Sequence, residues 1–447
     1  MNPQPVDPRI TIAETLAEEL LKCLAEKATK AFDKYLYYNA DQETTDFGIS
    51  TPQKMRNSRP GIGWASRAVN TLSDRVVFDG FANDKFGIND YMDSINATSI
   101  ISKGKHDTFI AGCAFIMVGD DVVTGQKVLV PFTALEATGK VDQTSGLLKY
   151  GLAVTKWSPP ARRTRGVRFA PCDYVVVTPN FTAIFKSRTI YSIVPNVTGR
   201  CLLHPLTHRS SADRPLGKSR LTNTARRIIQ EVGRLKRREE IAEEFYALPQ
   251  RYINGLAEGA EKDTNLDSAV GLVWAINKDE DGEKPEIGQL AQMSINQFET
   301  AKKDKARDFC AETALQLRNL GYETGNPTSA ESLSAMSDDL LLEATNSQDE
   351  MGRQIKEIAI TLRLALDGND TIPEGLDEIV PAWKPIFQVD IGAAGDAMYK
   401  LFTVMPELAG TVAGYRMLGV GIREAEELQK RRDAATAASF MNNGGAK

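Results

Sequence analysis

The sequence predicts a mainly helical α+β protein in which helices and strands occupy separate stretches of the chain. Apolar residues recur at steps of three and four near the N-terminus and again after about residue 219, which is the period of a helix. Between about residues 108 and 197 the period changes toward two, and Gly, Pro, Asn and Asp separate the apolar runs. Helices followed by a run of strands and then by more helices are typical of the α+β class.

Length and charge limit the classes of function. A chain of 447 residues can bury a large core, and several domains are possible. Of these residues 42% are hydrophobic and 25% are charged, with a net charge of −5. A protein that coats nucleic acid through general basicity is therefore excluded, and any contact with DNA must be local.

Cysteine usage and hydropathy indicate an intracellular site of assembly. The cysteines are odd in number, widely spread and without a CxxC pair, so we expect reduced, buried thiols. They are Cys23, Cys113, Cys172, Cys201 and Cys310. The N-terminus carries no basic region followed by an apolar run, so we expect no secretory signal. The most apolar late segment, 391–422, is broken by charges, and we expect no membrane span.

In the N-terminal half we expect three helices and then strands. The helices cover 12–38, where Leu16, Leu20 and Leu24 share a stripe, then 64–77 and 88–103. The predicted strands cover 109–118, 127–135, 147–157, 167–169, 174–177 and 182–185. The proline-bearing stretch 204–216 is predicted to be an irregular connector.

The first long helix begins near Ser219 and combines a narrow apolar seam with a basic face. Leu221, Ala225, Ile228 and Val232 step by four and three along one side. The basic residues away from this seam are Arg220, Arg226, Arg227, Arg234, Lys236, Arg237 and Arg238. Such a run is either a solvated face or a face turned toward a polyanion or an acidic neighbour.

An insertion separates the first long helix from the second. Within 247–293, Val270–Ile276 is a strand candidate and 277–282 has the composition of a turn. The acidic residues of that turn lack the ligand spacing and the closing Glu of a calcium loop.

Two more long helices follow. The second covers 295–320 and ends at Gly321, a predicted left-handed cap. After the loop 322–327, Thr328 is predicted to cap the third helix, with Glu331 completing a capping box.

Gly352 weakens the middle of the third helix, so we expect a kink there. Beyond it we expect a turn at 367–370, an extended segment at 381–387 and a disordered tail from Asn442. Three helices are predicted over 393–405, 407–418 and 421–438.

Patterns for catalysis are absent. Gly217-Lys218-Ser219 resembles the end of a phosphate-binding loop, but Ala212 stands where that loop needs its first glycine. Asp46-Phe47-Gly48 matches a kinase triplet with no catalytic-loop pattern before it, which indicates chance. There is no HExxH, no nucleophile elbow and no Cys/His cluster with zinc spacing. We therefore expect no enzyme activity, no catalytic residue, no metal site and no cofactor.

Five local patterns, in order along the chain, resemble one family. They are Arg67 to Phe81, Leu216-Gly-Lys-Ser-Arg220, Leu248-Pro-Gln-Arg-Tyr-Ile-Asn-Gly255, Asn326-Pro-Thr-Ser-Ala-Glu331 and Pro381 to Leu418. Together they resemble the portal proteins of tailed bacteriophages, the head-to-tail connectors of the long-tailed type. The resemblance covers nearly the whole chain and departs at 322–325, where the family's loop often reads differently.

The resemblance implies a portal fold with wing, stem, clip and crown regions. Residues 1–210 would form most of the wing, 211–246 and 294–320 the two stem helices, 247–293 the clip, 321–328 the tunnel loop, 329–366 the long kinked wing helix, and 367–447 the wing and crown helices with the tail. It implies a ring, usually of twelve copies, at one capsid vertex of the virion, assembled in the host cytoplasm. The implied partners are the terminase packaging motor, the major capsid protein, a scaffold, a head–tail adaptor and double-stranded DNA bound without sequence specificity.

Three groups of site residues follow from the resemblance. The tunnel loop would offer Tyr322, Glu323, Thr324, Asn326 and Thr328 to DNA. The stem would present Arg226, Arg227, Arg234, Lys236, Arg237 and Arg238. The clip would offer Trp274, Lys278, Asp279 and Asp281 to the motor or adaptor. The alternatives are another ring-forming connector or minor capsid protein, and a nucleotide-driven packaging enzyme.

Overall fold

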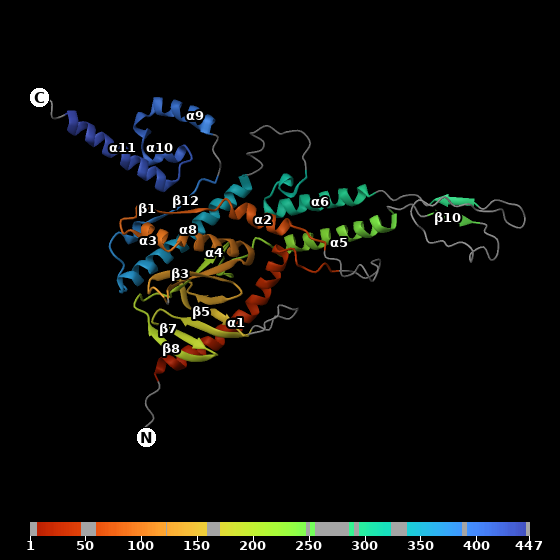
Figure 1. Ribbon diagram of the computed structural model, residues 1–447, viewed down its shortest axis with the longest axis horizontal. Helices are drawn as coiled ribbons and strands as arrows, with labels where there is room; N and C mark the ends of the chain where they lie inside the picture. Colours follow the sequence, from red (N-terminus) through yellow and green to blue (C-terminus); the bar gives the residue numbers. More distant parts are fainter. Residues whose placement is uncertain are drawn as a thin grey trace, which may run out of the picture.

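The structure is a computed structural model, and it confirms the α+β class. It describes residues 7–45, 60–121, 123–158, 170–246, 251–254, 286–289, 295–322, 338–386 and 391–443. A body of sheets and helices carries an arm of two long helices on one side and a group of helices near the C-terminus on another (Figure 1).

The lower layers of the body are a helix and a five-stranded sheet. Helix α1 (Pro8–Tyr38) begins after Asp7, whose side chain accepts a hydrogen bond from the Arg9 amide at 3.0 Å. It packs Leu20 and Leu24 against one face of the sheet, next to Val176. The strands, all antiparallel, are β4 (Ala137–Val141), β5 (Leu148–Trp157), β6 (Pro171–Val177), β7 (Phe181–Lys186) and β8 (Thr189–Pro195).

Two of these five strands were not predicted. The sequence pattern identifies β5, β6 and β7 but misses β4 and β8, which lie at the two edges of the sheet. Strand β8 is largely exposed, and β4 is buried but consists mainly of small and polar residues, so neither shows a clear apolar alternation. The predicted strand at 167–169 lies outside the described residues.

A three-stranded sheet forms the next layer, between the five-stranded sheet and the helical layer. Its order is β3 (Lys127–Thr133), β2 (Cys113–Asp120) and β9 (Leu203–Thr207). In β2, Phe115 faces the five-stranded sheet, whereas Ile116 faces the helical layer. Alternate residues of a strand point to opposite faces, so a strand between two layers is apolar at successive positions.

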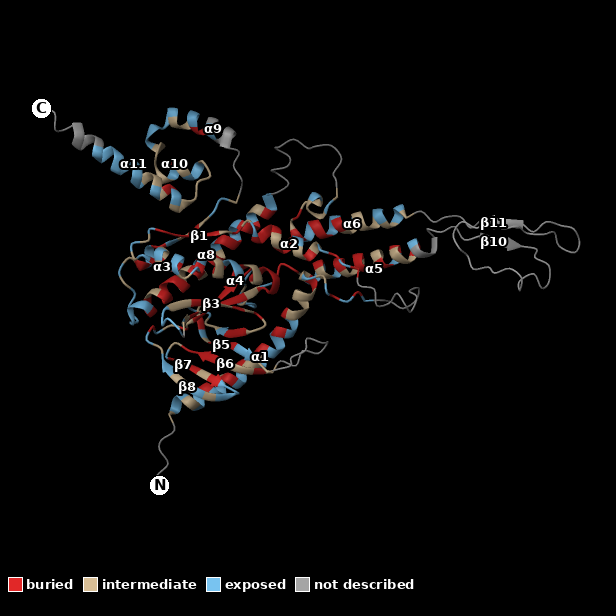
Figure 2. Ribbon diagram, in the orientation of Figure 1, coloured by how far each residue is buried: buried red, intermediate tan, exposed pale blue. Residues whose placement is uncertain are grey.

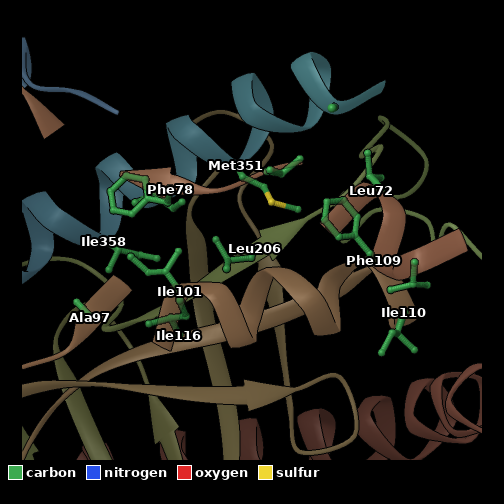
Figure 3. Close-up of a cluster of buried hydrophobic side chains, with 14 of the residues drawn as sticks. Leu72, Phe78, Ala97, Ile101, Phe109, Ile110, Ile116, Leu206, Met351 and Ile358 are labelled. Carbon is green, nitrogen blue, oxygen red and sulfur yellow. The ribbon is translucent and has the colours of Figure 1, made fainter. Parts of the chain in front are cut away.

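The helical layer completes the largest core. It contains α2 (Trp64–Ser73), α3 (Ile88–Ser94), α4 (Ala97–Ala111), α8 (Asp338–Asp367) and the paired strands β1 (Phe78–Ala82) and β12 (Val380–Trp383), with the short helix η3 (Leu376–Glu378). Figure 3 shows Phe109 and Ile101 of α4 facing Met351 and Ile358 of α8, with Leu206 of β9 between them.

Several boundaries in this layer correct the sequence predictions. The predicted helix 88–103 is two helices, because Asn96 takes a left-handed conformation (φ 54°) between them. Phe109 was predicted to begin a strand but lies in α4, and β2 starts only after Gly112 (φ 103°). The segment predicted to be an irregular connector begins within β9, which includes Pro205. Helix α8 is unbroken through Gly352, and the predicted kink there stays a prediction.

The arm consists of α5 (Asn223–Tyr246) and α6 (Asn296–Thr313), with the short antiparallel pair β10 (Arg251–Asn254) and β11 (Glu286–Gln289) beyond their ends (Figure 1). The predicted second helix is shorter than expected, because Ala314 adopts a left-handed conformation (φ 50°) that ends α6. A separate turn of helix, η2 (Leu317–Leu320), follows, and Gly321 caps it with φ 85° in the predicted left-handed conformation. The strand candidate Val270–Ile276 and the predicted cap Thr328 lie outside the described residues.

The C-terminal helices are α9 (Ile391–Val404), α10 (Val412–Met417) and α11 (Ile422–Asn443), with the short helix η4 (Pro406–Leu408). The predicted helix 407–418 is interrupted, because Gly410 has φ 77°. Asn442, predicted to be disordered, belongs to α11.

All five cysteines are free thiols, as predicted, but only Cys201 and Cys310 are buried. In the described ranges no helix combines the length and the apolar composition that crossing a bilayer requires.

Candidate functional site

The arm is held together by an apolar seam close to the body. Ala225, Ile228 and Val232 of α5 are buried, as are Ala306 and Phe309 of α6. On α6 the buried positions gather at the end near the body, and exposed positions increase outward (Figure 2). On α5 buried positions continue outward as far as Ala242. The predicted seam of the first long helix is therefore confirmed. A helix with one apolar stripe is stable only where that stripe is covered, here by the second helix and the body.

Two ion pairs join α5 to α6 along the arm. Lys302 Nζ lies 2.7 Å from Glu239 Oε2, and Lys305 Nζ lies 2.9 Å from Glu231 Oε2. The hydrogen bond to Glu231 raises the pKa of Lys305. Two of the five glutamates of α5 thus pair with lysines of α6.

A buried cluster of charged residues joins the arm to the body. We call Arg220, Glu343, His208 and Arg209 the anchoring cluster. Arg220 precedes α5 and is only 3% exposed. One terminal guanidinium nitrogen, Nη1, contacts Glu343 Oε2 of α8, and the other, Nη2, donates a hydrogen bond to the carbonyl of Thr313 at 2.6 Å. Since Thr313 is the last residue of α6, the Arg220 side chain connects the beginning of α5 and the end of α6 to α8.

The other members of the cluster converge on the same carboxylate. His208 Nε2 lies 3.5 Å and Arg209 Nη2 lies 3.2 Å from Glu343 Oε1. Ser347, one turn further along α8, lies with its Oγ 3.4 Å from His208 Nδ1. Glu343 is therefore surrounded by cationic and N–H groups on both of its oxygens, which offsets the cost of burying its charge.

Electrostatics fix the charge states in the cluster. Burial by itself raises the pKa of Glu343, but the hydrogen bond from His208 and the charges of Arg220 and Arg209 outweigh it and hold the pKa at about 2. Burial lowers the pKa of His208, against the opposing effect of Glu343. At neutral pH the cluster therefore contains an ionised carboxylate, two guanidinium cations and a neutral imidazole.

The turn that resembles the end of a phosphate-binding loop is used to build this junction. The amide of Lys218 donates to the carbonyl of His208 at 2.7 Å, and the amide of Arg220 donates to that of Phe109 at 3.1 Å. The Ser219 hydroxyl donates to the Ile110 carbonyl at 2.5 Å. A phosphate-binding loop needs free amides that point at its ligand, and these amides are already bonded to the carbonyls of Phe109 in α4 and of His208, which directly follows β9.

The residues of the predicted basic face have different environments. Arg226 contacts Asp33 of α1, and Lys236 Nζ donates to the carbonyl of Gly61 at 3.3 Å. Arg237 is buried, Arg234 is half-buried, and Arg227 and Arg238 are exposed. Part of the predicted basic face therefore packs on the body, and its role as the basic face of the stem stays a prediction.

The other predicted site residues lie almost entirely beyond the described residues. Tyr322 is half-buried beside η2, its amide donates to the Leu317 carbonyl at 3.2 Å, and burial raises the pKa of its hydroxyl. Glu323, Thr324, Asn326, Thr328, Trp274, Lys278, Asp279 and Asp281 lie outside the described residues. Within the described ranges no group of His, Cys, Asp and Glu side chains is placed to hold a metal ion.

The sequence did not reveal the anchoring cluster. In the sequence, Arg220 belongs to a basic run, His208 lies close to Pro205, and Glu343 lies within an ordinary helical pattern, so none of the three indicates a buried cluster. The contacting residues are more than a hundred positions apart along the chain, so no local spacing could have connected them.

Comparison with known proteins gives only distant structural similarity. No protein-family model and no curated protein matches the sequence. A chain in the neck of a native gene transfer agent (GTA) particle, computed with C12 symmetry, aligns with 83% of this chain and 95% of its own, at 12% identity and a TM-score of 0.43. A chain in the neck of an empty GTA particle, computed with C6 symmetry, aligns with 81% of this chain and 91% of its own, at 11% identity and a TM-score of 0.44.

A third similar structure is the virion of a native gene transfer agent particle. One of its chains aligns with 84% of this chain and 95% of its own, at 11% identity and a TM-score of 0.40. Similarity at this level establishes neither a shared family nor a shared function.

Proposed function

We propose that this protein is a portal subunit, which forms a ring-shaped channel at one vertex of a phage capsid. Double-stranded DNA would pass through the channel during packaging and ejection, without sequence-specific contacts and without catalysis or a cofactor in the ring. The partners would be other copies of the chain in a ring of twelve, the terminase motor, the major capsid protein, a scaffold and a head–tail adaptor.

The order of elements is the observation that carries this proposal. A long helix, an insertion, a second helix, a loop and a third long helix follow one another, flanked by sequence patterns that resemble portal proteins. The arm built by α5 and α6 extends from the body and is fixed at its base to α8 by Arg220 and Glu343. A rigidly anchored pair of amphipathic helices suits side-by-side packing of copies in a closed ring.

The alternative of a nucleotide-driven enzyme has less support. It needs a phosphate-binding loop, and the amides around Lys218 and Arg220 are occupied by carbonyl groups. Overall acidity also suits a channel, because each neutralised phosphate would add affinity for DNA and slow its passage.

Native mass spectrometry of the purified protein, with and without ATP, tests the proposal. We expect a closed ring near twelve copies whose mass ATP does not change. A stable monomer or dimer that binds ATP would overturn the proposal in favour of the packaging enzyme. A ring of much smaller subunit number, seated between head and tail when added to assembling particles, would favour another connector.

A further inference from the structure

A groove of about 670 Å³ lies where α8, β12 and the C-terminal helices meet. In Figure 1, β12 lies between α8 and the helices α10 and α11. The groove follows α8 from Thr345 to Lys356, which is about 16 Å at 1.5 Å per residue. Arg416 of α10 and Ile422 at the start of α11 line it from the C-terminal side. The groove is therefore bounded by three parts of the fold that are remote from the arm.

Part of the groove surface is apolar and incompletely covered. Val380 is 48% exposed, although it belongs to a paired strand. Trp383, Ile386 and Val420 are half-buried, and the ring of Trp383 packs against that of Phe78 with 5.6 Å between centroids. Exposed apolar side chains that line a concave site favour a ligand with apolar groups of its own.

The charged residues of the groove are mainly cations. Arg353, Lys384 and Arg416 are exposed, and none of them forms an ion pair with a described residue. With Lys356 and the single carboxylate of Asp349, the described lining residues have a net charge of +3, whereas the whole chain has −5. The groove is thus locally basic in an acidic protein, which favours an anionic ligand.

A buried hydrogen-bond donor also lines the groove. The side chain of Gln348 belongs to a residue that is only 9% exposed, and its Nε2 has no acceptor among the described residues. A buried N–H group without a partner is costly. A ligand that brings a carbonyl or carboxylate oxygen to Gln348 would remove this cost, so the groove offers a specific polar contact besides its charge.

We propose that this groove binds an acidic peptide segment of another protein, with an apolar side chain against Val380 and Trp383 and carboxylates paired with Lys384 and Arg416. An oxygen of the segment would accept a hydrogen bond from Gln348. A length of about 16 Å accommodates about five residues in an extended conformation. The inference goes beyond the proposed function and does not depend on a ring, because a single copy supplies all of these residues.

A peptide suits the groove better than DNA does. Phosphate groups would pair with the cations, but they would leave the apolar surface at Val380 and Val420 uncovered. A segment with both carboxylates and an apolar side chain uses both kinds of surface. DNA and a second copy of the chain are distinguishable outcomes of the test.

Phage display of random dodecapeptides supplies the probe, with selection on the full-length protein and counter-selection on K384E/R416E. We expect the enriched peptides to carry two or more Asp or Glu around an apolar residue. The synthetic peptide should bind K384E/R416E at least about tenfold more weakly than wild type at 0.15 M salt, and Val380→Ser at least about threefold more weakly. A peptide with Lys in place of its acids should instead prefer K384E/R416E.

K22E/K30E is the matched control, because it makes the same change of charge at exposed positions of α1 and should leave the affinity unchanged. Far-ultraviolet circular dichroism confirms that each variant folds. No enrichment, or a peptide that K22E/K30E weakens as much as K384E/R416E does, would overturn the inference.

Two other results would assign the groove to a different occupant and overturn the inference. One is a single-stranded dodecanucleotide that binds wild type but not K384E/R416E, while no peptide is enriched. The other is a loss of assembled mass in K384E/R416E by native mass spectrometry, which would show that a second copy fills the groove. Absence of peptide binding leaves the portal proposal intact, and a chain that forms no ring leaves the peptide site intact.

Discussion

Charged residues have different environments at the base of the arm, where the anchoring cluster lies, and along its shaft, where α5 and α6 pair beyond the body. At the base, the side chains of Arg220 and Glu343 are 2% and 6% exposed. Along the shaft, those of Lys305 and Glu231 are 35% and 31% exposed. Removing one partner of a buried pair leaves an uncompensated charge and costs about 3–5 kcal/mol, whereas an exposed pair contributes about 0.2–1 kcal/mol. The base therefore fixes the position of the arm, whereas the ion pairs between α5 and α6 are accessible to solvent.

The largest expected effect comes from the centre of the anchoring cluster. Glu343→Gln keeps the shape of the side chain but leaves Arg220 buried without its counter-charge. We expect it to lower the free energy of unfolding by about 3–5 kcal/mol, measured by urea denaturation. Asp339→Asn, an exposed position on the same helix, is the matched control and should change it by less than about 0.5 kcal/mol.

Removing both charges sharpens the same comparison. R220M/E343L replaces the pair with apolar side chains and leaves neither charge uncompensated. We expect it to cost less than Glu343→Gln alone, because the penalty of the single variant is mainly that of an isolated buried cation. A double variant at least as destabilised as the two single changes combined would contradict this account of the cluster.

The turn at Gly217 should also be sensitive. Its φ is 74°, and a β-carbon there would lie 2.5 Å from the carbonyl oxygen of His208 and 2.7 Å from that of Gly112. We expect Gly217→Ala to cost more than about 2 kcal/mol in the same denaturation experiment. Gly146 has the same φ of 74° but no atom within 4 Å of the added carbon. Gly146→Ala should therefore cost only about 1 kcal/mol, and equal effects would rule out close packing at Gly217.

The strand that leads into the base makes stability depend on pH. Burial lowers the pKa of His204 to about 3 and also lowers that of His208, so the folded chain keeps both imidazoles neutral. Below about pH 6.5 the unfolded chain binds a proton at each of these two histidines, and the folded chain does not. The free energy of unfolding should therefore fall as pH decreases from 6.5, by up to about 1.4 kcal/mol per pH unit for each histidine.

Comparison with His204→Gln isolates one part of this dependence. Asp107 has the opposite effect on the pH dependence of stability. Burial raises its pKa to about 6, so the folded chain binds a proton there at a higher pH than the unfolded chain does. The difference in unfolding free energy between wild type and His204→Gln should shrink as pH falls from 6.5 to 5. Below about pH 4.5 the low pKa of Glu343 adds a further loss that Glu343→Gln lacks. Parallel pH profiles for wild type and His204→Gln would contradict the neutral, buried state of His204.

The smallest effect is expected on the shaft. Lys305→Ala removes the contact with Glu231, in which both side chains are about one third exposed. We expect a loss of about 0.5 kcal/mol or less, and less still at 1 M salt, where charges are screened within about 3 Å. A loss of unfolding free energy as large as that of Glu343→Gln would contradict the difference between buried charges at the base and exposed charges along the shaft.

The sequence predicts the helices better than the contacts between them. The seam of α5 was visible because Leu221, Ala225, Ile228 and Val232 follow the helical period, and Gly321 was recognisable as a cap because few other residues adopt a positive φ easily. Strand β9 was missed because His204 and Pro205 are not typical of a strand sequence. The strand is buried because neighbouring elements pack on it, and the local sequence does not show this. The local sequence pattern indicates which face of a helix or strand is apolar, but not which other element packs on that face.

Prediction of the candidate site from the sequence is limited in the same way. The basic run before and within α5 was evident, yet its division between the body, the anchoring cluster and an exposed flank depends on Asp33, Glu343 and the packing of α6. Each of these partners is remote in sequence, and only the tertiary fold brings them to the arm.

Electron microscopy of the purified protein is the most direct test of the account. We expect closed rings with a continuous central channel. Monomers, two-fold dimers or rings without a through-channel, observed under conditions where the chain is folded, would contradict it.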